Sequence, residues 1–189
     1  MADIINLTNY HPERSDRSFS LPILWFWFTY ASANEIHTDD KPSRYQIEKY
    51  PEFIGKVLDV GANLYHSPLN LAELAHLVER TEYKIYSSEH DVSRKAFRNI
   101  GECRERVVRE VNKAWKSIND VSECIAHDLS PKSTELGLKL FSESTLDIYD
   151  SLYVTIAKEY KTNLILTDDT DYVASITLAG FPAIIMAGW

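Results

Sequence analysis

The sequence predicts a mixed α/β fold with a mainly parallel sheet, and three observations lead to this class. Short apolar runs of strand length recur at 63–67, 163–167 and 183–186. Segments with apolar residues at every third or fourth position separate them, and this alternation is typical of βαβ units. The 189 residues, 44% hydrophobic and 25% charged, suit one globular domain. We therefore expect a polar N-terminal arm over residues 1–20 and a single domain over 21–189.

The elements of the N-terminal half follow from composition and spacing. The first polar stretch shows no clear period, hence the expected arm. The run Ile23–Ala31 (ILWFWFTYA) is short, aromatic and bounded by proline and serine, so it is predicted to be a buried strand. Pro51 suits the first turn of a helix, and apolar residues at helical spacing follow it. After the strand at 63–67, Ser67-Pro68 precedes an amphipathic helix with Glu73 near its start.

The C-terminal half shows longer helical periods. Apolar positions step by three or four from 92 to 121, which predicts one long helix. Residues 133–160 again have a helical pattern, with Ser144 or Thr145 as an N-cap within it. Two strands follow, and a short helix over 172–178 is expected between them.

Charge is divided unevenly along the chain. The net charge of −8 argues against non-specific coating of nucleic acid, which needs many Lys and Arg side chains. The segment from Arg94 to Lys116, however, contains eight basic and three acidic residues, which gives it a net charge of +5. A chain of this kind can hold a polyanion on one face and a divalent metal on another.

Several classes of protein are excluded by simple features. The longest apolar run is far too short for a membrane helix and no apolar signal core is present, so we expect no membrane contact and a cytoplasmic protein. Cys103 and Cys124 form no CxxC motif, which argues against structural zinc and a disulfide framework. The six glycines never cluster, so no phosphate-binding loop is expected, and the histidines lack metal-ligand spacing.

Acidic residues provide the sharpest local signal. Asp168, Asp169 and Asp171 follow a buried strand, and ligands bind at the carboxyl ends of parallel strands. Carboxylates this close repel one another unless water or a cation screens them, and oxygen-only ligands suit Mg²⁺ or Mn²⁺. The alternative is a solvated turn that caps the next helix. Asp147 and Asp150 add carboxylates on one side of a helix, although each alone would usually be a surface residue.

Together these acidic residues match a family pattern. The segment Asp150–Tyr172 (DSLYVTIAKEYKTNLILTDDTDY) resembles the C-terminal half of a PIN domain, the nuclease fold of toxin–antitoxin ribonucleases and of several RNA-processing enzymes. In that family an Asp opens a helix, and a following strand ends in Thr-x-Asp with a further Asp two residues on. Residues 67–80 (SPLNLAELAHLVER) resemble the family's second acidic position, which falls on Glu73. The resemblance covers about residues 22–187 and implies a three-layer α/β/α sandwich, enlarged by helices around 90–140.

The resemblance implies a ribonuclease that hydrolyses RNA phosphodiester bonds with Mg²⁺ or Mn²⁺. The implied metal ligands are Glu73, Asp150, Asp169 and Asp171, and Thr167 would orient a carboxylate or a metal-bound water. The basic helix would hold the RNA backbone through Arg94, Arg98, Arg104 and Arg109. In a toxin–antitoxin pair the partner would be an antitoxin or another inhibitory protein. The aromatic content of 12% also favours such a partner or a homodimer.

One departure from the family pattern affects the first acidic position. PIN domains begin with a strand that ends in Asp-Thr-Asn, and the predicted strand here ends at Phe28 instead. Either Glu35, Asp39 or Asp40 replaces the missing carboxylate, or the site is incomplete. A catalytically degenerate PIN-like domain that binds RNA or protein is therefore the alternative to the enzyme. We favour the enzyme because four mutually repelling carboxylates have no obvious structural use, and a small-molecule phosphatase is a third alternative.

Overall fold

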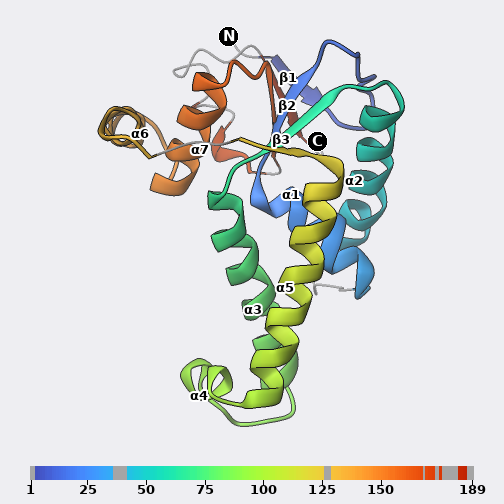
Figure 1. Ribbon diagram of the computed structural model, residues 1–189, viewed down its shortest axis with the longest axis vertical. Coiled ribbons are helices and arrows are strands. Elements are labelled where there is room, and N and C mark those ends of the chain that lie inside the picture. Colours follow the sequence, from blue (N-terminus) through green and yellow to red (C-terminus); the bar gives the residue numbers. More distant parts are fainter. Residues whose placement is uncertain are drawn as a thin grey trace.

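The computed structural model describes residues 3–35, 42–125, 129–167, 169–172, 175 and 183–186. These residues form a six-stranded parallel sheet in the order β1-β6-β5-β2-β3-β4, with helices on both faces (Figure 1). The strands are β1 (Asp3–Asn6), β2 (Arg17–Ser20), β3 (Asn63–His66), β4 (Glu123–Cys124), β5 (Leu164–Thr167) and β6 (Ala183–Met186). The predicted α/β class with a parallel sheet is confirmed, and so are strands within 63–67, 163–167 and 183–186.

Two of these strands lie within the first twenty residues, so the predicted polar arm is wrong at residues 3–6 and 17–20. β1 pairs with β6 at one edge, whereas β2 lies in the middle of the sheet between β3 and β5. β2 reads RSFS, in which Phe19 and both serines are buried. Two serines in a four-residue strand produce no apolar run, and for this reason the sequence did not reveal a central strand.

The aromatic run after β2 is helical, so the prediction of a strand over 23–31 is wrong. It forms α1 (Pro22–Phe26) and a π-helical segment, η1 (Trp27–Ala31). Leu21 has extended backbone, and Pro22 occupies the first helical turn, where its fixed φ is favourable. The segment contacts β5 and the helices α2 (Pro42–Asp59), α3 (Leu69–Ser87) and α5 (Gly101–Val121). A helix buried on nearly all sides has no polar face, so its apolar run resembles that of a buried strand.

Helix α2 begins at Pro42, well before the predicted start, and Pro51 lies inside it. A proline within a helix removes one backbone hydrogen bond and usually weakens the helix. Here tertiary packing outweighs that cost, because Tyr50, Phe53 and Ile54 on both sides of the proline are at most 1% exposed.

The predicted long helix over 92–121 is two helices. α4 (Arg94–Arg98) is capped by Ser93, whose hydroxyl accepts a hydrogen bond from the Ala96 amide, and Ile100 then has extended backbone as the N-cap of α5. The apolar period continues through this break, because both helices pack on α3 or on each other. α3 and α5 run side by side away from the sheet, with α4 at their far end (Figure 1).

The helical pattern over 133–160 is also two helices, α6 (Pro131–Glu143) and α7 (Ile148–Glu159). The N-cap of α7 is Asp147 rather than Ser144 or Thr145, because the Asp147 carboxylate accepts a 2.9 Å hydrogen bond from the Asp150 amide. The short helix expected over 172–178 lies mostly outside the described residues.

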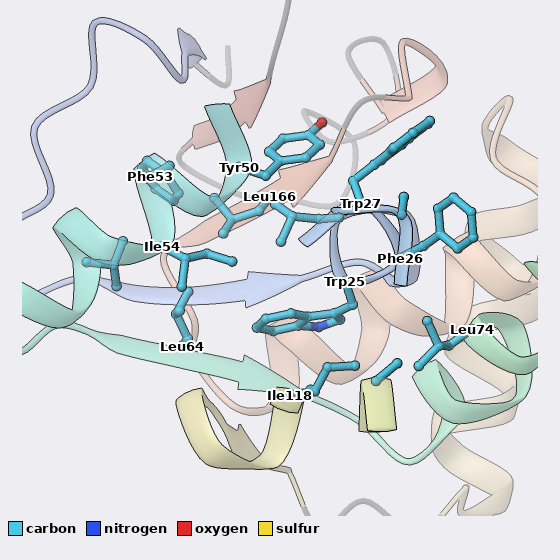
Figure 2. Close-up of a cluster of buried hydrophobic side chains, with 14 of the residues drawn as sticks. Trp25, Phe26, Trp27, Tyr50, Phe53, Ile54, Leu64, Leu74, Ile118 and Leu166 are labelled. Atoms are coloured by element: carbon cyan, nitrogen blue, oxygen red, sulfur yellow. The ribbon is translucent and has the colours of Figure 1, made fainter. Parts of the chain in front are cut away.

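The two faces of the sheet carry separate hydrophobic cores, as an α/β/α arrangement requires. Leu64, Leu164 and Leu166 face the larger core, which includes Trp25 and side chains of α2, α3 and α5 (Figure 2). Phe19 and Ile165 face the other core, where α7 supplies its apolar side. Within the part of the chain that the structure describes, no helix is both long and apolar enough to cross a membrane.

Candidate functional site

The strand order places a topological switch point at the middle of the sheet. From β2 the chain builds outward through β3 and β4, and then crosses back to place β5 on the other side of β2. In open parallel sheets, ligands bind outside the carboxyl ends of the strands at such a point, which here are the ends of β2 and β5. The predicted acidic residues come from elements that begin or end at this edge, namely α3, α7 and the turn after β5.

Asp150 lies in the first turn of α7 and is partly buried. The Tyr172 hydroxyl donates a 2.6 Å hydrogen bond to Asp150 Oδ1. Burial is the main cause that raises the pKa of Asp150 to about 7; the negative charges of Asp147, Asp169 and Glu73 add to this rise, while the Tyr172 hydrogen bond opposes it. Asp150 is therefore the point where the acidic residues interact, and it can carry a proton near neutral pH.

Glu73 approaches the same site from α3. Its Oε2 accepts a 3.2 Å hydrogen bond from the Tyr153 hydroxyl on α7, across 80 residues of sequence. Burial raises the pKa of Glu73, the Tyr153 hydrogen bond lowers it, and the charge of Asp147 raises it. The contact with Tyr153 fixes the Glu73 carboxylate beside α7, as the predicted site requires.

The turn after β5 carries the remaining predicted residues. Thr167 is 1% exposed, and its Oγ1 accepts a 2.9 Å hydrogen bond from the Asp169 amide. Asp169 Oδ1 in turn accepts a 2.8 Å hydrogen bond from the Asp171 amide. Thr167 thus positions the acidic turn, and Asp169 lies close enough to Asp150 to affect its pKa. Asp171 is exposed, and its carbonyl accepts a 3.3 Å hydrogen bond from the Thr145 hydroxyl before α7; Asp168 lies outside the described residues.

Phe28 does not end a strand, so under the implied family pattern the first acidic position would fall on Ser20 instead. The central strand that ends at the switch point is β2, and its last residue is Ser20. Ser20 is fully buried, and its Oγ has no hydrogen-bond partner among the described residues. Phe28 instead packs in the larger core, edge-on to Trp25 at 6.1 Å. Of the three proposed replacements, Glu35 is exposed, whereas Asp39 and Asp40 lie outside the described residues.

Asn70 joins the two strand ends beside the site. This fully buried side chain accepts hydrogen bonds from the amide and hydroxyl of Ser67 at 2.8 and 3.0 Å, and donates one of 3.0 Å to the Ser20 carbonyl. Residues three apart lie on the same side of a helix, so the bond from Asn70 to Ser20 directs Glu73 toward the carboxyl edge of the sheet.

Substituting Asn70 by Ala should therefore destabilise the fold. The variant leaves the Ser20 carbonyl and the Ser67 amide buried without these partners, at an expected cost of about 2–6 kcal/mol at roughly 1–3 kcal/mol per group. Urea denaturation checks this value. Asn99→Ala is the matched control, because Asn99 makes one exposed side-chain bond to the Lys95 carbonyl and its loss should cost under about 0.5 kcal/mol. Equal losses in the two variants would contradict the role of Asn70.

Sequence reasoning missed four residues of the site: Asn70, Tyr153, Tyr172 and Ser20. Two signals were available. Asn70 is a polar residue on the buried side of an apolar helix, and both tyrosines follow a predicted acidic residue closely in the sequence. Ser20 could not be identified while β2 was unrecognised. The tyrosines fix the carboxylates by hydrogen bonds, which suits a site that must hold several like charges together.

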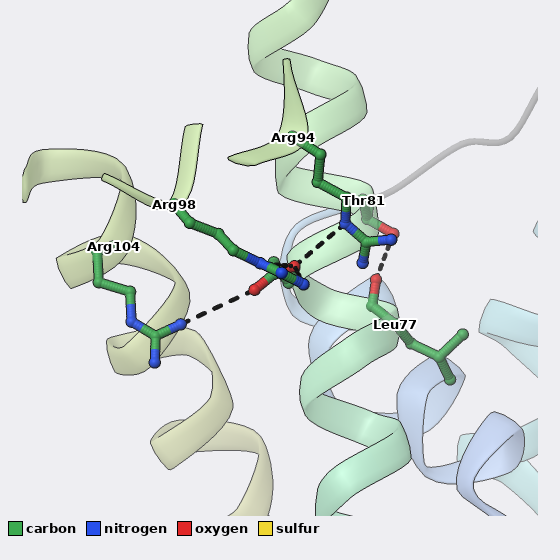
Figure 3. A network of polar contacts seen from close by, with 6 residues as sticks. Leu77, Thr81, Arg94, Arg98 and Arg104 are labelled. Carbon is green, nitrogen blue, oxygen red and sulfur yellow. Dashed lines mark hydrogen bonds and ion pairs between the residues drawn. The ribbon is translucent and has the colours of Figure 1, made fainter. Parts of the chain in front are cut away.

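The predicted RNA-binding arginines are engaged in ion pairs. Arg94, Arg98 and Arg104 converge on Glu79 of α3, and Figure 3 shows this arrangement. Arg109 pairs instead with Glu110 on its own helix. The pKa of Glu79 is lowered, mainly by its hydrogen bond from Arg98. These arginines join α4 and α5 to α3, and RNA contact stays a prediction for them.

The acidic residues fit a divalent cation in kind. Among the described residues, no three Asp, Glu, His or Cys side chains are grouped closely enough to hold a metal ion together. Mg²⁺, however, usually keeps several waters and takes only one or two protein carboxylates together with substrate phosphates. Asp150, Asp169 and Glu73 supply oxygen donors whose mutual repulsion a cation would relieve.

Comparison with protein-family models finds no match to this chain. Comparison with curated proteins also finds no match. The family resemblance therefore rests on the residues described above.

Proposed function

We propose that this protein is a divalent-metal-dependent ribonuclease of PIN-like fold. The observation that carries the proposal is that Asp150, Asp169 and Glu73 lie near the carboxyl edge of a parallel sheet, at its topological switch point, where the charges of Asp169 and Glu73 raise the pKa of Asp150. The parallel sheet and the two cores on its faces agree with the sandwich that the resemblance implies. The position of Thr167 at the end of β5, with its hydroxyl bonded to the Asp169 amide, also supports the proposal.

Asp150 and Asp169 would hold the ion, with Glu73 and Asp171 as direct or water-mediated ligands. Bound Mg²⁺ or Mn²⁺ would supply an activated water and stabilise the leaving oxygen. Tyr172 and Tyr153 orient the Asp150 and Glu73 carboxylates through their hydroxyls. Thr167 fixes the backbone of Asp169. Because the pKa of Asp150 is about 7 without metal and only the carboxylate binds a cation, metal binding should release a proton from Asp150 below about pH 7.

Asp169→Asn should reduce both metal binding and cleavage. In the wild type, millimolar MnCl₂ should raise the melting temperature, because the ion binds only the folded state. The variant should lose this rise, and its cleavage of a fluorescent single-stranded RNA should fall at least about 100-fold, the upper range for residues that support a metal ligand. Asp120→Asn, the same change at an exposed position on α5, is the control. A wild type that shows neither a metal-dependent rise nor cleavage would overturn the proposal.

Ser20 favours the second candidate, a degenerate PIN-like domain that binds RNA or protein. A serine at the end of β2 removes one carboxylate from the implied ligand set and leaves a neutral hydroxyl there. A degenerate domain would bind RNA in EDTA without cleaving it in Mn²⁺. Under either candidate, a toxin role, an antitoxin or other inhibitory partner, and a homodimer remain predictions from the sequence.

A further inference from the structure

We propose that the groove between α3 and α5 is a binding subsite for one nucleotide of single-stranded RNA, with its phosphate held by Arg98 and Arg104. The choice of ligand rests on the proposed function and extends it to a specific place on the surface. Among the four arginines predicted to bind RNA, it selects the two that line this groove.

The groove has the size and lining of a small-ligand site. Its volume is about 320 Å³, at the lower end of the roughly 300–1,000 Å³ range of such sites. Small and apolar side chains from both helices line it, among them Ala75 and Val108, and His76 and Asn112 add polar groups. Apolar walls with a few polar groups suit a base and its sugar, and the volume limits the occupant to about one nucleotide.

The charge around the groove favours an anion. Arg98 donates to Glu79 Oε1 from Nε and Nη2 at 2.9 and 2.6 Å, Arg94 donates at 3.2 Å, and Arg104 approaches Oε2 at 3.8 Å (Figure 3). Three guanidinium groups thus surround one carboxylate, which leaves a net charge of +2 within this cluster. At 3.8 Å the Arg104 contact exceeds a hydrogen bond, so this guanidinium can turn to a phosphate without losing one there.

The exposed fractions of the side chains show which residues of this cluster a ligand can contact. The Glu79 side chain is 11% exposed, whereas those of Arg98 and Arg104 are 50% and 57% exposed. The Glu79 carboxylate therefore lies at the bottom of the cluster, and the guanidinium groups of Arg98 and Arg104 are exposed to solvent. Arginine is well suited to such a site because its planar donors match phosphate oxygens.

The groove and the acidic site involve neighbouring faces of the same helix, α3. Glu73 and Glu79 are six residues apart on α3, about 9 Å along the helix axis. Ala72 lines the groove, and Glu73 follows it roughly 100° further around the helix. One RNA strand can therefore lie with a phosphate near the carboxylates and the next part of its chain beside Arg98 and Arg104.

Binding of a short fluorescent single-stranded RNA in EDTA tests the proposal without cleavage. Arg104→Gln should weaken binding and lower the slope of log Kd against log salt by about 0.7, the value for one phosphate contact on a single strand. Arg80→Gln makes the same charge change at an exposed position on the same pair of helices and should leave the slope unchanged. Equal effects of the two variants would mean attraction by overall charge alone, and would overturn the proposal.

A neutral variant tests whether the groove itself is occupied. Val108 lines it and is 42% exposed, so Val108→Trp can fill the groove without disturbing a core. We expect at least a tenfold loss of affinity for the RNA, and no loss for Val108→Ala; equal melting temperatures would show that both variants fold. RNA binding unaffected by Val108→Trp would overturn the proposal, as would an acidic peptide that binds there while RNA does not. Groove-dependent RNA binding in a protein that fails to cleave RNA in Mn²⁺ would refute the ribonuclease and leave the subsite standing.

Discussion

Replacing Ser20 by Asp is expected to make metal binding at least about tenfold tighter, a gain of about 1.4 kcal/mol. Ser20 ends β2 beside β5, with its Cα opposite Leu166, one residue before Thr167. A carboxylate there restores the acidic position that the family resemblance assigns to the end of the first strand. It also adds a buried charge to a group of repelling carboxylates, which should cost several kcal/mol without metal. Ser20→Asp should therefore melt below the wild type in EDTA and show a larger rise in Mn²⁺.

Ser20→Asn separates charge from size in this experiment. Asn has nearly the shape of Asp but cannot neutralise a cation, so this variant should show no larger rise in Mn²⁺ than the wild type. If the melting temperature of Ser20→Asp in Mn²⁺ rises no more than that of Ser20→Asn, β2 does not end at the metal site. If the variant also gains cleavage, Ser20 limits the activity of the natural protein.

The N-terminal strands show why the sequence indicated the fold class better than its individual elements. β5 and β6 are apolar runs with turn residues around them, and both were predicted. β2 is a central strand with a single large apolar residue, Phe19, between two buried serines. The aromatic run after β2 has enough apolar residues for a strand, but it forms a helix covered on nearly all sides. In both cases, packing against elements distant in the sequence determined the local secondary structure.

The carboxylates of the candidate site could be predicted from the sequence, because Asp and Glu residues at such places alone suggest a metal site. Carboxylates after a strand and near helix starts indicated Asp150, Asp169 and Glu73, and the structure relates these three through the pKa of Asp150. Tyr153 and Asn70 act through contacts with residues 80 and 50 positions away. Such contacts follow from the order of the strands, which one sequence does not reveal. The same limit applies to Glu79, since its three arginine partners come from two other helices.

Asp150→Asn is expected to abolish cleavage and, without metal, to stabilise the protein at high pH. The pKa of Asp150 rises from 3.8 to about 7 on folding, mainly through burial. The folded protein thus binds this proton more tightly than the unfolded chain. The resulting stability is fully present below about pH 4 and is lost as the pH rises through 7. By linkage the loss amounts to at most about 4 kcal/mol, less any screening by water at this partly exposed side chain.

Urea denaturation in EDTA at pH 5, 6, 7 and 8 measures the difference between wild type and Asp150→Asn. The introduced amide cannot ionise but can still accept the Tyr172 hydrogen bond through its carbonyl oxygen, so the substitution removes the charge and keeps the contact. The stability gain of the variant should therefore be larger at pH 8 than at pH 5, by at most about 2.5 kcal/mol before the reduction for screening by water. Asp120→Asn should show no such trend. A gain that is equal at both pH values would mean that Asp150 is already ionised at pH 5. Burial and the neighbouring carboxylates would then not raise the pKa of Asp150 as this site requires.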